Sequence, residues 1–312
     1  MTQFLWDTSH YDGPLSVATL RTAHAQGIVG LTHKVGEGTG GDDPLDGPVL
    51  ANARDAGIPL LGGYHVVRSG PVGPQVDALL ALADRDEPWW RTWPGWFWQV
   101  DLERWPTDPV PAATGIAFGR ELRRRTGRVV AMYASRGQYG DQLAGWTADD
   151  GPLWNARYVS GEGDFREIYP GDKSAGWAPY SGREPDFLQY SSRATIAGVT
   201  TSDASAYRGT LEQLTALLTG GAAMTSPNPV EIDALSILTG LAHGVEKVTV
   251  HDRDGVLLLS PYYARIAAEV AKNIPAVVVD AAAVAAALAR NAEFMAAVAK
   301  AVNDDAARRL AQ

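Results

Sequence analysis

The sequence of 312 residues contains no cysteine. This absence excludes a disulfide framework, a thiolate metal site and a cysteine nucleophile. The chain also lacks any stretch of about 20 apolar residues free of charge, so we expect no membrane span and no stable membrane insertion. Positive charge is scarce, because 27 Lys and Arg stand against 36 Asp and Glu, a net charge of −9. A nucleic-acid partner, which requires a basic surface, is therefore not expected.

Two further absences narrow the function. The opening residues show no basic segment followed by an apolar run and a cleavage site, so we expect no signal peptide. The six histidines do not form H-E-x-x-H or another short metal-ligand spacing. We therefore expect neither a metal nor a cofactor, and a zinc amidase is disfavoured. His10 and His65 are expected to meet as hydrogen-bonding groups.

Short apolar strands alternate with amphipathic helices over the first two-thirds of the chain. This alternation predicts parallel βα units, and their number favours a closed barrel over an open sheet. In such a barrel the chemistry lies at the carboxyl ends of the strands. The expected helices are 17–25, 48–56, 75–83 and 112–125, and the expected strands are 3–7, 30–34, 60–66, 96–103, 129–133, 153–158 and 186–190.

The composition changes after residue 218. A stretch rich in Gly, Ala, Ser and Pro predicts a linker over 219–230. Residues 231–312 predict a small, mainly helical domain that contains a hairpin over 245–260, with Asp254-Gly255 as its turn. Apolar residues recur at spacings of three and four in the Ala-rich stretch 279–310, which predicts an amphipathic helix. We expect this helix to pack or to form a homo-oligomer, with wall binding as the alternative.

The most informative local pattern is WFWQVDLERW, residues 96–105. Side chains alternate between the two faces of a strand, so Asp101 and Glu103 share one face and the apolar residues Trp96, Trp98, Val100 and Leu102 share the other. Two carboxylates on one wall repel each other, and one of them should keep its proton at higher pH. A proton donor beside an anion is what cleavage of a glycosidic bond requires. The alternative is a strand end that carries two solvated acids.

Other acids and aromatic residues sharpen this pattern. Asp7 ends the first expected strand and Asp203 follows the last one, and closure of a barrel would bring both beside Asp101. Tryptophans gather around the D-x-E strand. Sugar rings stack on aromatic planes, so tryptophans can line a carbohydrate groove. Trp96 and Trp98 are expected in the core instead. For Trp89, Trp90 and Trp93 the core and the groove are equally expected.

Several motifs occur in an order that resembles the glycoside hydrolase family 25 muramidases, the Chalaropsis-type lysozymes of bacteria and phage endolysins. They cover roughly residues 3–208. They are DTSHYDG for the opening D-x-S, HKVGEGTGGDD for K-x-x-E-G, GYH for G-x-Y-H, VDLE for D-x-E, and MYAS, LWNARY and LQYSS for later strands. The last motif departs from the D-x-N of many relatives, because it reads Asp203-Ala204-Ser205 here.

The resemblance implies an irregular TIM-like (β/α)8 barrel over residues 1–218 and a role for each matching residue. Glu103 would be the general acid, and Asp101 would stabilise or orient the positive charge on the sugar, through the substrate's 2-acetamido group in one version of the mechanism. Asp7 and Asp203 would complete the acidic floor. The implied substrate-binding residues are Tyr64, Tyr133, Trp154, Gln189, Glu37 and His65.

The resemblance also implies a function. We expect hydrolysis of the β-1,4 bond between N-acetylmuramic acid and N-acetylglucosamine in bacterial peptidoglycan. Together with the lack of a signal peptide, it favours a phage endolysin that stays in the host cytoplasm until lysis and then acts on the cell wall. The alternative is a non-catalytic barrel of a phage tail or surface protein that binds wall glycan.

Overall fold

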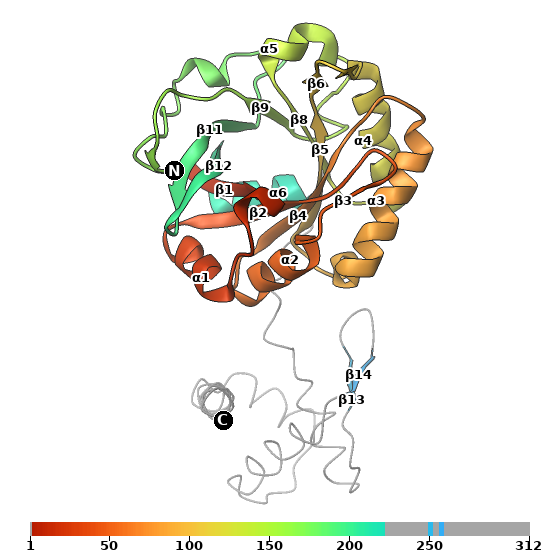
Figure 1. Cartoon of the computed structure of the whole chain (residues 1–312), viewed down its shortest axis with the longest axis vertical. Coiled ribbons are helices and arrows are strands. Elements are labelled where there is room, and N and C mark those ends of the chain that lie inside the picture. Colours follow the sequence, from red (N-terminus) through yellow and green to blue (C-terminus); the bar gives the residue numbers. More distant parts are fainter. Residues whose placement is uncertain (1, 222–248, 252–255, 259–312) are drawn as a thin grey trace, which may run out of the picture. The chain divides into compact units, whose positions relative to one another are not determined.

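A computed structural model of the chain describes residues 2–221, 249–251 and 256–258 (Figure 1). The chain divides into two units, Met1–Ser226 and Pro227–Gln312. The predicted C-terminal helices and most of the predicted linker lie outside the described residues, so these domain boundaries remain predictions.

Strands from the whole first unit form a closed ring (Figure 1). β1 pairs with β2 on one side and with β12 on the other, which closes the barrel. The ring is irregular because β12 runs antiparallel to both of its neighbours. The predicted eight-stranded α/β barrel is confirmed. The ring strands are β1 (Thr2–Thr8), β2 (Ile28–Glu37), β4 (Leu60–Val66), β5 (Trp96–Leu102), β8 (Val130–Ala134), β9 (Leu153–Ala156), β11 (Phe187–Ile196) and β12 (Val199–Arg208).

Short pairs decorate the ring at its loops. β3 (Gly41–Asp42) extends β2, and β10 (Gly163–Asp164) lies beside β11. β6 (Arg104–Trp105) and β7 (Asp108–Pro109) form a separate hairpin directly after β5.

Helices surround the ring, and the four predicted ones, α1 to α4, are confirmed (Figure 1). Local signals set their ends: the Ser16 side chain caps α1, and Gly127 ends α4 in the left-handed conformation. The helices are α1 (Val17–Ala25), α2 (Asp46–Asp55), α3 (Val72–Asp86), α4 (Ala112–Thr126), α5 (Arg136–Tyr139) and α6 (Leu211–Thr219). The short 3-10 turns are η1 (His10–Asp12), η2 (Pro88–Arg91), η3 (Gly140–Leu143) and η4 (Ala175–Trp177).

Two apolar layers follow from the alternation of side chains along the strands. The outer layer packs the outward faces of the strands against the helices, and it includes Trp96 and Trp98 of β5. Trp90 is buried in this layer, and the partly buried Trp89 and Trp93 pack against it. The outer face of β5 is opposite to the one that carries Asp101, so these tryptophans belong to the core and not to a sugar groove.

A smaller apolar layer fills one end of the barrel interior. Phe97 of β5 meets Leu5 and Phe187 there, and Leu214 and Leu218 of α6 complete the layer. α6 begins with a capping box, in which Thr210 and Gln213 satisfy each other's backbone N–H groups. Phe97 and Phe187 come at the starts of their strands, so α6 closes the amino-terminal end of the barrel. The polar interior therefore lies at the carboxyl ends of the strands.

Beyond the barrel, only one element falls within the described residues. β13 (Thr249–His251) and β14 (Val256–Leu258) pair antiparallel, which confirms the predicted hairpin, although its turn lies outside the described residues. Within the described part of the chain, no helix has the length and apolar character that crossing a membrane requires.

Candidate active site

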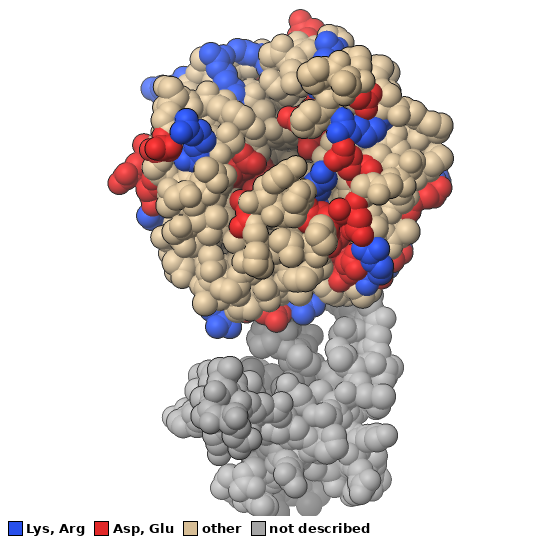
Figure 2. Space-filling model, in the orientation of Figure 1, with Lys and Arg blue, Asp and Glu red and all other residues tan. Residues whose placement is uncertain are grey.

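Acidic side chains gather in the hollow at the centre of the barrel face (Figure 2). Asp101 is the last inward residue of β5, and Glu103 follows directly after the strand. Asp7 of β1 and Asp203 of β12 are register partners across the pair that closes the ring. The barrel thus brings the four predicted acids to one end of its interior, as the sequence predicts.

Hydrogen bonds from three strands hold Asp7 in place. The Thr32 hydroxyl of β2 donates to one carboxylate oxygen. The Gln189 amide donates to the other oxygen at 2.6 Å, and the Ser205 hydroxyl donates to it at 3.2 Å. Asp7 is only 4% exposed, so these three donors replace water around it.

Gln189 connects this carboxylate to two tyrosines. Its carbonyl oxygen accepts hydrogen bonds from the Tyr133 and Tyr158 hydroxyls, both at 2.8 Å. With its amide committed to Asp7, the Gln189 side chain can adopt only one orientation. Tyr133 and Gln189 therefore lie at the predicted site, but Gln189 acts by positioning Asp7 and the two phenols.

Trp154 supports the same network from below. Its indole N–H donates to the Ser205 hydroxyl at 3.0 Å, and its ring stacks on Phe187 with centroids 4.4 Å apart. The side chain is fully buried, so the predicted direct contact with a sugar is wrong for Trp154. It forms part of the floor that orients Ser205 toward Asp7.

Burial and mutual repulsion raise the pKa values of the acids. Burial raises the pKa of Asp101 well above its ordinary value, and the neighbouring charge of Glu103 adds to this effect. Burial also raises the pKa of Glu103, while the Arg68 guanidinium lowers it in part. Asp101 and Glu103 titrate as a pair, so the pair keeps a proton to a higher pH than a free carboxyl would.

The other two acids respond to burial in the same direction. Burial raises the pKa of Asp203 to about 8, with further contributions from Asp7, Asp12 and Glu103. Burial also raises the pKa of Asp7, although its three side-chain hydrogen bonds oppose the shift. Tyr64 projects from β4 among these groups, since the charges of Asp101, Asp7 and Asp203 all act on the pKa of its hydroxyl.

The predicted residue Glu37 lies at the edge of this cluster, at the end of β2. It forms ion pairs with Lys34, at 2.7 Å, and with Arg68. The charge of Lys34 reaches Asp101, and that of Arg68 reaches Glu103. The loops around Glu37 and Arg68 form an open pocket that Thr39, Ser69 and Gln75 also line. Lys34 belongs to the K-x-x-E-G motif of the sequence, whereas the sequence does not identify Arg68, which lies far from the acids along the chain.

His65 lies on the wrong face of β4 for substrate. Its neighbour Tyr64 faces the barrel interior, so His65 faces outward and stacks on Phe118 of α4 at 5.0 Å between ring centroids. The ring is fully buried. The prediction that His65 lines the sugar site and meets His10 is therefore wrong.

A different pair of histidines meets at the barrel mouth. His10 Nδ1 and His33 Nε2 lie 2.7 and 3.3 Å from the two carboxylate oxygens of Asp43. Burial alone would raise the pKa of Asp43, but hydrogen bonds from these two rings and from the His10 N–H outweigh it and lower the pKa. Asp43 thereby fixes η1, which comes directly after β1 and Asp7, and no local motif in the sequence indicates this contact.

Comparisons with known proteins agree on the fold. No protein-family model matches the sequence, and no curated protein matches it either. Among solved structures, the chain is similar to a bacterial lysozyme from Streptomyces coelicolor, with 21% identity and a TM-score of 0.56 over 70% of this chain and 98% of that one. It is also similar to a muramidase from Trichobolus zukalii (22%, TM-score 0.52) and to a family GH25 lysozyme from Aspergillus fumigatus (20%, TM-score 0.53). Each covers 70% of this chain, and the chain covers 99% and 100% of these two.

The fold and the acid-lined interior define the first unit as an irregular α/β barrel with a cluster of carboxyl groups at one end. More specifically, the first unit has the fold of the family 25 lysozymes, and the resemblance that the motifs indicate is confirmed at the level of the fold.

Proposed function

We propose that this chain is a glycoside hydrolase that degrades peptidoglycan as an N-acetylmuramidase, cleaving the β-1,4 bond between N-acetylmuramic acid and N-acetylglucosamine. The observation that carries the proposal is the gathering of Asp7, Asp101, Glu103 and Asp203 at the open end of the barrel with raised pKa values. The shared fold with proteins described as lysozymes and muramidases supports the choice of substrate.

The chemistry assigns a separate role to each acid of the D-x-E pair. Glu103 donates the proton to the glycosidic oxygen, since it follows the end of β5 and its raised pKa lets it keep a proton. Asp101 lies deeper in the barrel and stabilises or orients the positive charge on the sugar, either directly or through the 2-acetamido group. Asp7 and Asp203 complete the acidic floor beneath the sugar.

Exposed aromatic rings support a glycan as the ligand. Among the described residues, the exposed large hydrophobic side chains are Tyr11, Trp105 and Tyr158. Each follows the carboxyl end of a barrel strand, β1, β5 and β9 respectively. The apolar faces of sugar rings stack on such aromatic planes. A polysaccharide lying across the mouth would meet these rings on either side of the acids.

The test removes the proposed proton donor without changing its size. We expect Glu103→Gln to lower the release of reducing sugar from purified cell walls by about 100-fold or more, because general acid catalysis contributes that much. Glu212→Gln, at an exposed glutamate of α6 on the closed end of the barrel, should retain full activity. Mass spectrometry of the wild-type digest should show muramic acid at the reducing ends. Undiminished activity of a folded Glu103→Gln variant would contradict the proposal.

The alternative, a barrel that only binds wall glycan, makes the opposite prediction. A pure binder would leave the turbidity of a wall suspension unchanged even with wild-type protein, and Glu103→Gln would bind walls equally well. A role in host lysis by a phage, with residence in the cytoplasm before lysis, remains a prediction from the sequence.

A further inference from the structure

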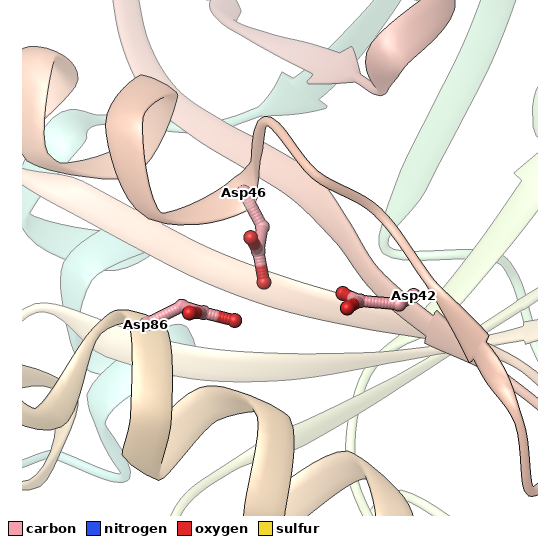
Figure 3. Close-up of side chains that lie close together, drawn as sticks. All are labelled: Asp42, Asp46 and Asp86. Carbon is pink, nitrogen blue, oxygen red and sulfur yellow. The ribbon is translucent and has the colours of Figure 1, made fainter.

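A second acidic cluster lies on the outside of the barrel, between β3, α2 and α3 (Figure 3). Asp42 ends β3, Asp46 begins α2 and Asp86 ends α3. One carboxylate oxygen from each residue lies within 4.8 Å of the others. Figure 3 shows the Asp46 carboxylate pointing into the space between Asp42 and Asp86. The proposed catalytic residues take no part in this cluster.

Buried oxygens without partners distinguish this cluster from an ordinary acidic surface. Asp46 is only 2% exposed; its Oδ1 accepts from the Gly47 N–H at 2.7 Å, whereas its Oδ2 has no partner. Glu87 follows Asp86 and is fully buried, and no N–H or hydroxyl group donates to its carboxylate oxygens. Its carboxyl lies within hydrogen-bonding reach of that of Asp46, a contact that requires a proton on one of the two. Burial of unpaired carboxylates costs several kcal/mol each, so a proton or a cation must compensate them.

The available positive charge does not reach the buried acids. Arg85 bonds to both oxygens of Asp86 and to Asp42 at 2.9 Å, and its side chain is 54% exposed. No lysine or arginine of the described residues forms an ion pair with Asp46 or Glu87. Arg85 thus balances the outer side of the cluster and leaves the inner side negative.

We propose that Asp42, Asp46 and Asp86 bind a calcium ion, with Glu87 adding negative charge from the buried side. A set of carboxylate oxygens selects a hard cation. One oxygen of each carboxylate lies within 4.8 Å of the other two, so all three can approach a single ion. Calcium accepts several carboxylate oxygens at about 2.4 Å in a flexible geometry, whereas magnesium keeps more of its water. Arg85 would have to release Asp42 and Asp86 for the ion to bind, and its side chain, which is 54% exposed, can turn into solvent.

The ion would join β3, α2 and α3. One of the joined segments, the loop from Asp42 to Asp46, also contacts the mouth of the barrel. Asp43 lies in the loop between Asp42 and Asp46, and it holds His10 and His33 at the barrel mouth. The start of α2 already packs closely on the end of α3, since a Cβ on Gly47 would lie 3.0 Å from the Asp86 carbonyl oxygen. Calcium at this point would fix the loop that positions Asp43.

Calorimetric titration of the chelator-treated full chain with CaCl2 tests the proposal. We expect one saturable site and, at a hundredfold excess of calcium over Kd, a rise in Tm of roughly 5 °C or more. Absence of binding, together with identical Tm values in calcium and in chelator, would overturn the proposal and leave a shared proton between Asp46 and Glu87 as the compensation.

Variants locate the ion. Asp86→Asn and Asp42→Asn each remove a ligand and should abolish the calcium-dependent rise in Tm. Asp84→Asn is the matched control, because Asp84 lies on the same helix but pairs with Arg91 on the surface, and it should bind calcium like the wild type. Loss of binding in all three variants, or in none, would contradict the assignment. None of these measurements depends on hydrolytic activity.

Discussion

Asp101 and Glu103 stand two residues apart but interact with different cations. Lys34 opposes the rise in the pKa of Asp101, and Arg68 opposes the rise in the pKa of Glu103. Arg68 itself is held by Glu37 and lies 3.9 Å from Asp108, so its position is fixed by the loops around it. Arg68 therefore limits the rise in the pKa of Glu103, and with it the highest pH at which Glu103 keeps its proton.

Removal of this charge should change the pH profile in one direction. Arg68→Met takes away the group that lowers the pKa of Glu103, so the pKa rises and Glu103 stays protonated to higher pH. We expect the alkaline limb of kcat/KM for wall hydrolysis to move upward. Arg120→Met, at a surface ion pair with Asp150 on the outside of α4, should leave the limb in place. A shift to lower pH, or none, would show that Arg68 does not act on the proton donor.

The sequence identifies the acids of the candidate site, and the resemblance names Gln189, but neither predicts the contact between Gln189 and Asp7. Parity along β5 places Asp101 in the interior, and ring closure brings Asp7 beside Asp203. The same alternation excludes that the adjacent residues Tyr64 and His65 both line the barrel interior, because neighbouring side chains of a strand face opposite sides. Gln189 touches Asp7 only because β1 and β11 both flank β12, a neighbourhood that no local pattern encodes.

Among the strands, β12 escapes prediction from the sequence because its composition is unusual. Its residues are mostly Thr, Ser, Ala and Asp, and small or polar residues of this kind are not typical of a buried strand. A tight turn at Ala197 and Gly198 reverses the chain into it, and both residues have positive φ. Such turns usually carry Asn-Gly or Asp-Gly, so Ala-Gly gives no signal. Helices α1 to α4 are predictable, since each has a regular apolar stripe.

Close packing between α4 and its neighbours makes a second prediction. A Cβ on Gly119 would lie 2.8 Å from the ring of the buried Trp146. Gly119→Ala should therefore destabilise the barrel by about 1–3 kcal/mol, reduced by up to ~1 kcal/mol of helix propensity. Gly73→Ala in α3 is the control, since its nearest neighbour is 3.8 Å away, and it should be neutral or stabilising. Urea unfolding of both variants measures the difference, and equal stabilities would show that α4 can move away from Trp146.

For the molecule as a whole, ring closure completes the barrel within the first unit. All eight ring strands lie within residues 2–208, and α6 then closes the amino-terminal end of the interior. Closure leaves no long strand edge within residues 2–221, because β3 and β10 have two residues each. Self-association through strands is therefore not expected of this part of the chain, and the predicted homo-oligomer is expected to form through the C-terminal stretch.

Shortening the chain after Gly221 separates these contributions. We expect residues 1–221 to keep the Tm of the barrel and its specific activity on soluble wall fragments, because Gly220 ends α6 in the left-handed conformation and completes the last helix of the barrel. Light scattering should give the mass of one copy for the shortened chain and a higher mass for the full chain if the Ala-rich helix associates. An oligomeric shortened chain would contradict the argument from closure, and a monomeric full chain would reject the proposed association while leaving the barrel unaffected.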